Sequence, residues 1–277
     1  MQITNTLILF LLNFIFLFTR ADLVAPNCQN GLQKSVLFVL DGSASVGQTH
    51  FDAAISFIQT ISDYLDISSQ EVALEQYGSS YVQIWEGGSF TNTGMWYQSR
   101  NEFYSMLNSV TYLNSGIATC SALDFANYNI LPFKEYPENS VVLITSNFSP
   151  DNPETCADKL RLDQRSTVYV IALGDVTQNP EAYAQLKGIA NEPSNDFLQM
   201  GQWETIMDYS SPVRYQTAQD IANRICGQKY CTCKNGEPAV DECPGNGIEY
   251  CQDCNWGYSI HPDLHVCIED PFLKILS

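Results

Sequence analysis

The stretch Val36–Gly47, VLFVLDGSASVG, ends an apolar run with one acid and two hydroxyls at alternate positions. The run VLFVL is typical of a buried strand, and Asp41, Ser43 and Ser45 follow it directly. Side chains at i, i+2 and i+4 converge only where the backbone curls into a loop. The stretch therefore predicts a strand that leads into a polar loop, which is either a working metal site or the remnant of one.

Continuous apolar segments predict three buried strands of a central parallel sheet, at Ser35–Leu40, Ser140–Thr145 and Thr167–Leu173. Two further strands are expected at Glu71–Tyr77 and Tyr81–Trp85, joined by a GSS turn. Helical spacing appears at His50–Asp66, Ser99–Ser109, Ser121–Ile130, Cys156–Gln164, Pro180–Ile189 and Thr217–Ile225. Thr49 and Asp52 suggest a capping arrangement for the first helix. This alternation predicts an α/β fold, a doubly wound and mostly parallel Rossmann-like sheet flanked by helices, with ligands beyond the carboxyl ends of its strands.

The N-terminus predicts export. Leu7–Phe18 is apolar apart from Asn13, and Thr19 and Ala21 occupy the −3 and −1 positions of a signal-peptidase site. The block is short for a membrane span, so residues 1–21 are expected to be a cleaved signal peptide rather than an anchor. The mature chain is predicted to be secreted and extracellular, with no membrane span.

Charge and cysteine content narrow the class of partner. The formal net charge is −18, from 13 basic and 31 acidic side chains, so nucleic acid and anionic membranes are poor partners. No acidic run exceeds two residues, which favours a solvated acidic surface over an acidic structural component of a mineralised matrix or coat. An even count of ten cysteines agrees with an oxidising compartment.

Six motifs in sequence order resemble a von Willebrand factor type A domain: VLFVLDGSASVG, HFDAAISFIQTI, EVALEQYGSS, LNSGIATCSALDFA, VVLITSNFSPD and VYVIALGD. The resemblance assigns residues 35–226 to this domain, after a lead-in at 22–34. Domains of this family are ligand-binding and adhesion modules, and many hold Mg²⁺ in a metal-ion-dependent adhesion site. The resemblance therefore implies a role in matrix assembly or adhesion, with extracellular or matrix proteins as partners.

Only part of the family's metal-ligand set is present. Asp41, Ser43 and Ser45 match its D-x-S-x-S loop completely. Ile117 stands where the family has a liganding Thr, and Ser146 stands where it has an Asp. Because hard divalent cations are held largely by carboxylate oxygens, any Mg²⁺ or Ca²⁺ is expected to bind weakly. The alternative is that the three matched side chains hydrogen-bond one another and cap the loop.

Two further residues are weak candidates for the missing ligands. Thr119 matches the family's second Thr, which is not its usual ligand, and Asp151 lies five residues beyond Ser146. Asn147-Phe148-Ser149 is a glycosylation sequon beside the substituted position, and Pro150 follows it. A glycan on Asn147 would crowd this face, so the face is expected to have lost its role as the main adhesive surface.

The cysteines fall into two groups. In the large domain, Cys28 is expected to pair with Cys226, as in some family members that close their termini, and Cys120 with Cys156. Residues 227–267 form a cysteine-rich module whose C-x-x-G-Y ending resembles an EGF-like module, before a tail at 268–277. Its six cysteines are expected to pair among themselves, with connectivity open: Cys231, Cys233, Cys243, Cys251, Cys254 and Cys267. Zinc ligation by Cys231, Cys233, Cys251 and Cys254 with His261 or His265 is the alternative, which export disfavours.

Catalysis is not expected. The chain contains only three histidines, His50, His261 and His265, and just His50 falls in the large domain, on a predicted surface helix. No Ser/His/Asp arrangement can be assembled from them, and the chain has neither a P-loop nor a G-x-G-x-x-G motif. The sequence therefore predicts a non-catalytic interaction protein, and it specifies neither the ligand nor the oligomeric state.

Overall fold

A computed structural model describes residues 33–79, 82–84, 96–174, 176–191, 197–199, 203–227, 231–238, 248–262 and 264–269. The predicted signal peptide, most of the lead-in with Cys28, and the tail beyond Glu269 lie outside the described residues. Within the described ranges, none of the helices combines the length and apolar character needed to cross a membrane.

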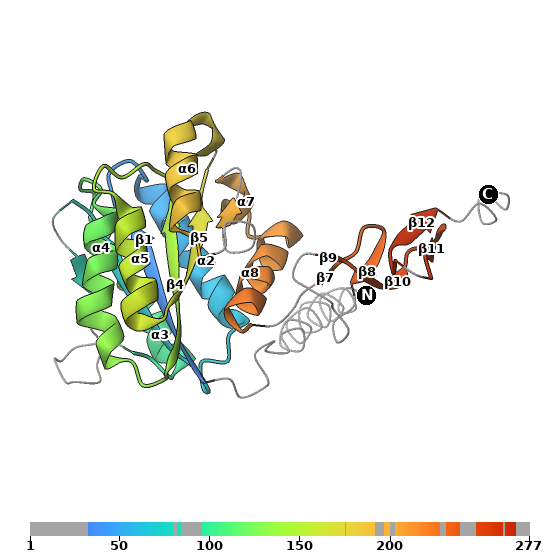
Figure 1. Cartoon of the computed structure of the whole chain (residues 1–277), viewed down its shortest axis with the longest axis horizontal. Coiled ribbons are helices and arrows are strands. Elements are labelled where there is room, and N and C mark those ends of the chain that lie inside the picture. Colours follow the sequence, from blue (N-terminus) through green and yellow to red (C-terminus); the bar gives the residue numbers. More distant parts are fainter. Residues whose placement is uncertain are drawn as a thin grey trace, which may run out of the picture.

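A six-stranded sheet in the order β3-β2-β1-β4-β5-β6 forms the centre of the large domain (Figure 1). The strands are β1 (Lys34–Asp41), β2 (Glu71–Tyr77), β3 (Val82–Ile84), β4 (Glu138–Thr145), β5 (Thr167–Ala172) and β6 (Phe197–Gln199). All neighbours pair in parallel except β3, which is antiparallel to β2. The predicted α/β class is therefore confirmed, because the continuous apolar runs are strands buried on both faces.

Helices cover both faces of this sheet. They are α2 (Gln48–Asp63), α3 (Arg100–Leu107), α4 (Thr119–Phe125), α5 (Pro153–Gln164), α6 (Pro180–Ile189), α7 (Glu204–Met207) and α8 (Pro212–Ile225). A π-helical turn at Ala126–Ile130 and a 3₁₀ turn at Leu131–Phe133 extend α4. Residues of α2, α3, α7 and α8 share one core cluster with the sheet, and residues of α4, α5 and α6 share the other.

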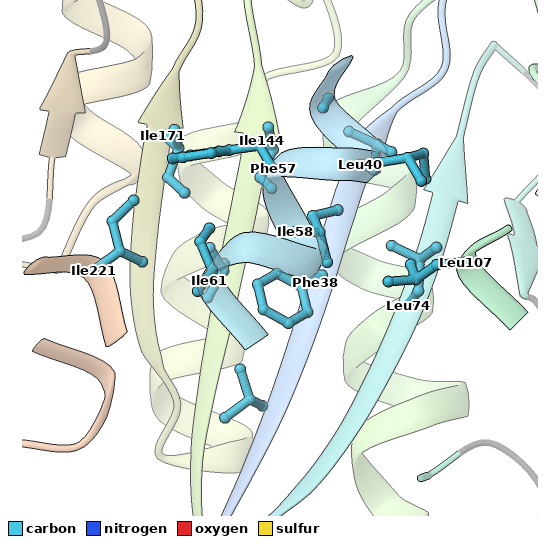
Figure 2. Close-up of a cluster of buried hydrophobic side chains, with 14 of the residues drawn as sticks. Phe38, Leu40, Phe57, Ile58, Ile61, Leu74, Leu107, Ile144, Ile171 and Ile221 are labelled. Atoms are coloured by element: carbon cyan, nitrogen blue, oxygen red, sulfur yellow. The ribbon is translucent and has the colours of Figure 1, made fainter. Parts of the chain in front are cut away.

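Alternation along β1 divides the core between the two faces. Val36, Phe38 and Leu40 pack toward α2, whereas Leu37 and Val39 pack toward α4 and α5. Figure 2 shows Phe38 beneath Ile58 and Ile61 of α2, between side chains of the neighbouring strands. The central strand is thus held by apolar contacts on both sides, which fixes the position of the loop that follows it.

The start of α2 corrects one prediction. The helix begins at Gln48 with Gly47 as its N-cap, and no side chain caps it, so the capping arrangement of Thr49 and Asp52 is wrong. Asp52 instead accepts a hydrogen bond from the Gln48 side chain, at 2.8 Å. Gly47 has φ 78°, a conformation that glycine adopts without a steric cost, so the turn into the helix is set by the backbone.

In the described part of the cysteine-rich module, the strands pair into three short two-stranded sheets. They pair β7 (Cys231–Thr232) with β9 (Ile248–Glu249), β8 (Gly236–Pro238) with β10 (Cys251–Cys254), and β11 (Tyr258–Ile260) with β12 (Cys267–Glu269). Disulfides join Cys233 to Cys251 and Cys254 to Cys267. Cys226, at the end of α8, is disulfide-bonded. Its expected partner Cys28, like Cys243, lies outside the described residues, so that pairing stays a prediction.

Candidate functional site

Three loops meet at the carboxyl ends of β1 and β4. The first loop, residues 42–47, follows β1, the second, residues 111–118, precedes α4, and the third, residues 146–152, follows β4. Ser43 forms an isolated bridge with Ser115, and the Ala44 amide donates to the Ser115 carbonyl at 2.6 Å. The first and second loops are therefore tied together by backbone contacts, on the face where the sequence placed the site.

Asp41 is the buried centre of this region, with a side chain 1% exposed. Its Oδ1 accepts the Ser43 amide at 2.8 Å, and its Oδ2 accepts the Thr145 hydroxyl at 2.7 Å. Burial raises the pKa of Asp41, and the hydrogen bonds from Ser43 and Thr145 offset only part of this rise. Both carboxylate oxygens are thus engaged by protein donors in a poorly hydrated position.

Asn147 connects the first loop to the third. Its Nδ2 donates to the Ser45 hydroxyl at 2.9 Å and to the Ser146 hydroxyl at 2.7 Å. The hydroxyl oxygens of Ser43 and Ser45 lie 2.8 Å apart, in hydrogen-bond contact. Hydrogen bonds between side chains therefore run in a row from Ser43 through Ser45 and Asn147 to Ser146.

Thr119 and Asp151, the two weak candidates, are used in another way. The Thr119 hydroxyl lies 3.1 Å from the Tyr77 hydroxyl, and the Thr119 amide donates to Ser149 Oγ at 2.9 Å. Ser149 donates in turn to Asp151 Oδ1 at 2.7 Å, and Asp151 Oδ2 accepts the Ser121 amide at 3.1 Å. Asp151 thus serves a first-turn amide of α4, a place where a helix favours negative charge.

These residues do not fit the divalent cation that the family resemblance implies. Ile117 packs half-buried against the core cluster of α4 and α5 and has no donor oxygen. Ser146 supplies a hydroxyl where the family has a carboxylate, and that hydroxyl accepts the Asn147 amide. An N–H group pointing at the hydroxyls competes with a cation for the same lone pairs. The only carboxylate in the matched set, Asp41, is already shared between two donors.

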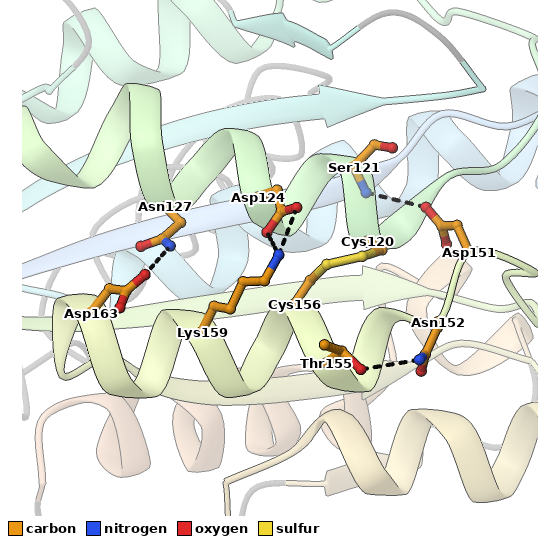
Figure 3. Close-up of polar contacts among 10 residues, drawn as sticks. All are labelled: Cys120, Ser121, Asp124, Asn127, Asp151, Asn152, Thr155, Cys156, Lys159 and Asp163. Atoms are coloured by element: carbon orange, nitrogen blue, oxygen red, sulfur yellow. Dashed lines mark hydrogen bonds and ion pairs between the residues drawn. A yellow bond between two sulfur atoms is a disulfide. The ribbon is translucent and has the colours of Figure 1, made fainter.

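The second and third loops are also joined through α4 and α5 (Figure 3). A disulfide links Cys120, in the first turn of α4, to Cys156, in the first turn of α5. One turn further along, Lys159 forms an ion pair with Asp124, at 3.1 Å. Asn127 donates to Asp163 at 2.8 Å at the far end of the pair. The three contacts form a row along the two helices. They fix the positions of the loops before α4 and α5 relative to each other.

Sequence reasoning missed three residues that shape the site. Tyr112 donates to the Ser43 carbonyl at 2.6 Å and accepts the Gly47 amide at 3.0 Å, so it supports the first loop from below. Thr145 and Asn147 supply the donors described above. In the motif TSN, the middle position shows the loss of the family's Asp, whereas the third position, Asn147, supplies a hydrogen-bond donor that the glycosylation sequon does not indicate.

Comparisons with known proteins agree with this architecture. The collagen alpha-4(VI) chain of Mus musculus is 30% identical over 182 residues, 63% of this chain and 7% of the collagen. The collagen alpha-1(XXI) chain of Homo sapiens is 25% identical over 210 residues, 75% of this chain and 20% of that one. The chain therefore spans a fifth or less of the length of either relative.

A solved structure has the same fold. Proximal thread matrix protein 1 from the mussel byssus, with a zinc-occupied metal-ion-dependent adhesion site, superimposes with a TM-score of 0.56 at 17% identity, over 70% of this chain and 46% of that chain. Residues 35–211 match the von Willebrand factor type A domain, a span that includes the parallel sheet and all three loops. The chain belongs to the von Willebrand factor type A domain family.

Proposed function

We propose that this chain is a secreted, non-catalytic interaction protein of the extracellular matrix, which acts in matrix assembly or adhesion through a von Willebrand factor type A domain with a degenerate metal site. The observation that carries the proposal is the Asn147 amide, which bridges the hydroxyls of Ser45 and Ser146. A side chain of the protein, rather than a bound cation, thereby joins the first and third loops. The relatives support the matrix role, since they include collagens and a byssal matrix protein.

The surroundings of the histidines support a role without catalysis. The ring of His50 stacks on that of Trp203, with centroids 4.2 Å apart, and its Nδ1 lies 3.0 Å from the Val46 carbonyl oxygen. This stacking and the backbone contact give His50 a packing role at the start of α2. His265 stacks on Tyr250 in the cysteine-rich module, at 4.3 Å between centroids. A general base acts through a ring nitrogen directed at a nucleophile, whereas the Nδ1 of His50 lies against a backbone carbonyl oxygen.

Glycosylation at Asn147 belongs to the same proposal. The sugar is attached to the side-chain nitrogen, which in the unmodified chain donates to Ser45 and Ser146. N-glycosylation leaves a single N–H on this nitrogen, so a glycan would remove at least one of these two hydrogen bonds and would cover the first loop. With or without the glycan, the first loop is therefore not available to a large ligand that binds through a cation. Mass spectrometry after enzymatic deglycosylation in oxygen-18 water tests this point, because an Asn147 peptide of unchanged mass removes the glycan from the proposal.

The central test is a calorimetric titration of the full chain with Mg²⁺ and Mn²⁺. We expect no heat of binding at millimolar metal, because Asp41 is the single carboxylate of the set and both its oxygens are occupied. The matched control is the double variant Ile117→Thr with Ser146→Asp, which restores the family's ligands. This variant is expected to bind Mn²⁺, and a further Asp41→Ala change is expected to abolish that binding.

The second candidate is a metal-dependent ligand-binding protein that uses Asp41, Ser43 and Ser45. The specific observation in its favour is that these three side chains converge in one loop, with hydroxyl oxygens 2.8 Å apart. The same titration separates the two candidates. Heat from the unmodified chain that disappears in Asp41→Ala would favour the second and contradict the first.

A further inference from the structure

The two described disulfides of the cysteine-rich module are in contact with each other. The sulfurs of Cys233, Cys251 and Cys267 all lie within 4.8 Å of one another, and Cys233 Sγ is 3.6 Å from Cys267 Sγ. These two sulfurs belong to different bridges, Cys233–Cys251 and Cys254–Cys267. The distance is that of atoms in van der Waals contact, so a thiolate formed at one sulfur already touches the other bridge.

Gly236 makes this close packing possible. A side-chain carbon at this position would lie 2.1 Å from the Asp253 carbonyl oxygen, 2.7 Å from Cys267 Sγ and 2.8 Å from Cys233 Sγ. Only glycine therefore lets the backbone of β8 lie against the sulfurs. The contact between the two disulfides therefore depends on Gly236 as well as on the cysteines.

The four sulfurs differ in their access to an external thiol. Cys254 is partly exposed, and it precedes Asn255 and Trp256, whose side chain is 75% exposed. Cys251 and Cys267 are buried. Cys233 is partly exposed, but its sulfur already has the Cys267 sulfur at 3.6 Å and the carbonyl oxygens of Asp253 and Lys234 at 3.8 and 4.0 Å, which occupy the space that an external thiol would need. Attack from outside is therefore directed to Cys254.

We propose that Cys254 is a thiol–disulfide exchange site, at which this chain becomes cross-linked to a cysteine of a partner protein. The partner's thiolate attacks Cys254 Sγ, forms the intermolecular disulfide and releases Cys267 as a thiolate. Cys267 then attacks Cys233 Sγ, forms a Cys233–Cys267 disulfide and releases Cys251 as a thiolate. One external thiolate is consumed and one buried thiolate is produced, so bonds and charge balance.

The second step explains why the cross-link would persist. In an ordinary exchange, the released thiolate stays beside the mixed disulfide and attacks it again, which expels the partner. Here the released Cys267 has a second disulfide within 3.6 Å, and capture by that bridge removes the competing nucleophile. The Cys120–Cys156 bridge offers a contrast, since the third ligand-type group beside it is the carboxylate of Asp124 and not a second bridge.

The test uses glutathione as the external thiol on the full chain at mildly alkaline pH, followed by acid quenching, alkylation and peptide mapping. The expected product carries glutathione on Cys254, a Cys233–Cys267 disulfide and an alkylated Cys251. Glutathione on Cys254 with Cys267 alkylated and Cys233–Cys251 intact would contradict the capture step. Absence of glutathione from Cys254, or its presence on Cys233, would overturn the site. The Cys120–Cys156 peptide in the same digest is the internal control and should stay paired.

A variant strengthens the assignment. Changing both Cys233→Ala and Cys251→Ala removes the capturing bridge while Cys254–Cys267 is retained. Glutathione recovered on Cys254 is expected to fall about tenfold, because Cys267 now expels it. An unchanged yield would contradict the capture step. The product mapping on the unmodified chain decides the matter independently if this variant does not fold.

Discussion

Glu75, in the middle of β2, has a carboxyl group that is fully buried. Alternation along the strand places it on the same face as Ala73 and Tyr77, which belong to the core cluster of α4 and α5. Among the described residues, neither carboxyl oxygen has a hydrogen-bond partner. Burial therefore raises the pKa of Glu75 well above its usual value. This burial was not predicted, because Glu75 stands between Leu74 and Gln76, and a polar pair near the end of a strand does not indicate a buried acid.

The pH dependence of stability tests this description. Because the pKa of Glu75 is higher in the folded than in the unfolded chain, its contribution is most favourable below the unfolded pKa of about 4.5 and is lost as the pH rises toward the folded pKa. The free energy of unfolding of the unmodified chain, relative to Glu75→Gln, should fall above pH 4.5 by up to about 1.4 kcal/mol per pH unit. Denaturant unfolding of both chains over a pH series measures it, and a difference independent of pH would contradict it.

At the scale of elements, the α4–α5 pair combines one covalent and several polar links. The disulfide closes a segment of 36 residues, whereas the Asp124–Lys159 ion pair is partly exposed, with side chains 33% and 41% accessible. A disulfide restricts the unfolded chain, and a solvated ion pair adds little. The disulfide should therefore dominate the stability of this pair.

Replacing both cysteines, as Cys120→Ala with Cys156→Ala, is expected to lower the free energy of unfolding by about 4 kcal/mol on the chain-entropy model. Asp124→Asn is the matched control on the same helix, and its loss should stay below about 1 kcal/mol. Urea unfolding monitored by circular dichroism measures both values. Equal losses in the two variants would show that the polar contacts, and not the disulfide, hold the helices together.

The elements also show where local patterns suffice. β2 lies at Glu71–Tyr77 as predicted, because the GSS turn that follows Tyr77 marks the end of a strand. Helix starts were less accurate: α5 begins at Pro153 rather than Cys156, and α8 at Pro212 rather than Thr217. Each of these first turns begins with a proline, which favours that position and breaks the hydrophobic spacing. The spacing alone therefore underestimated both helices.

At the scale of the whole molecule, the net charge of −18 is the dominant electrostatic property. Self-repulsion among like charges destabilises the compact state, and salt screens it over about 10 Å at 0.1 M. The melting temperature should therefore rise by a few degrees between low salt and physiological ionic strength. The rise should be equal in sodium and potassium chloride, since screening depends on ionic strength. A fall on adding salt would show that attractive ion pairs outweigh the repulsion.

From the amino-acid sequence alone, local patterns predicted the α/β class and the segments that form the parallel strands, and comparison with the family's motifs predicted that Ile117 and Ser146 replace two metal ligands. Each of these predictions rests on residues that are close together in the sequence or on a single position of a family motif. The side chains that occupy the place of the family's ligands became evident only in the folded chain. Thr145 reaches Asp41 across 104 residues and Asn147 reaches Ser45 across 102, through the pairing of β1 with β4. Hydrogen bonds between such distant residues depend on strand register, which hydrophobic spacing does not encode.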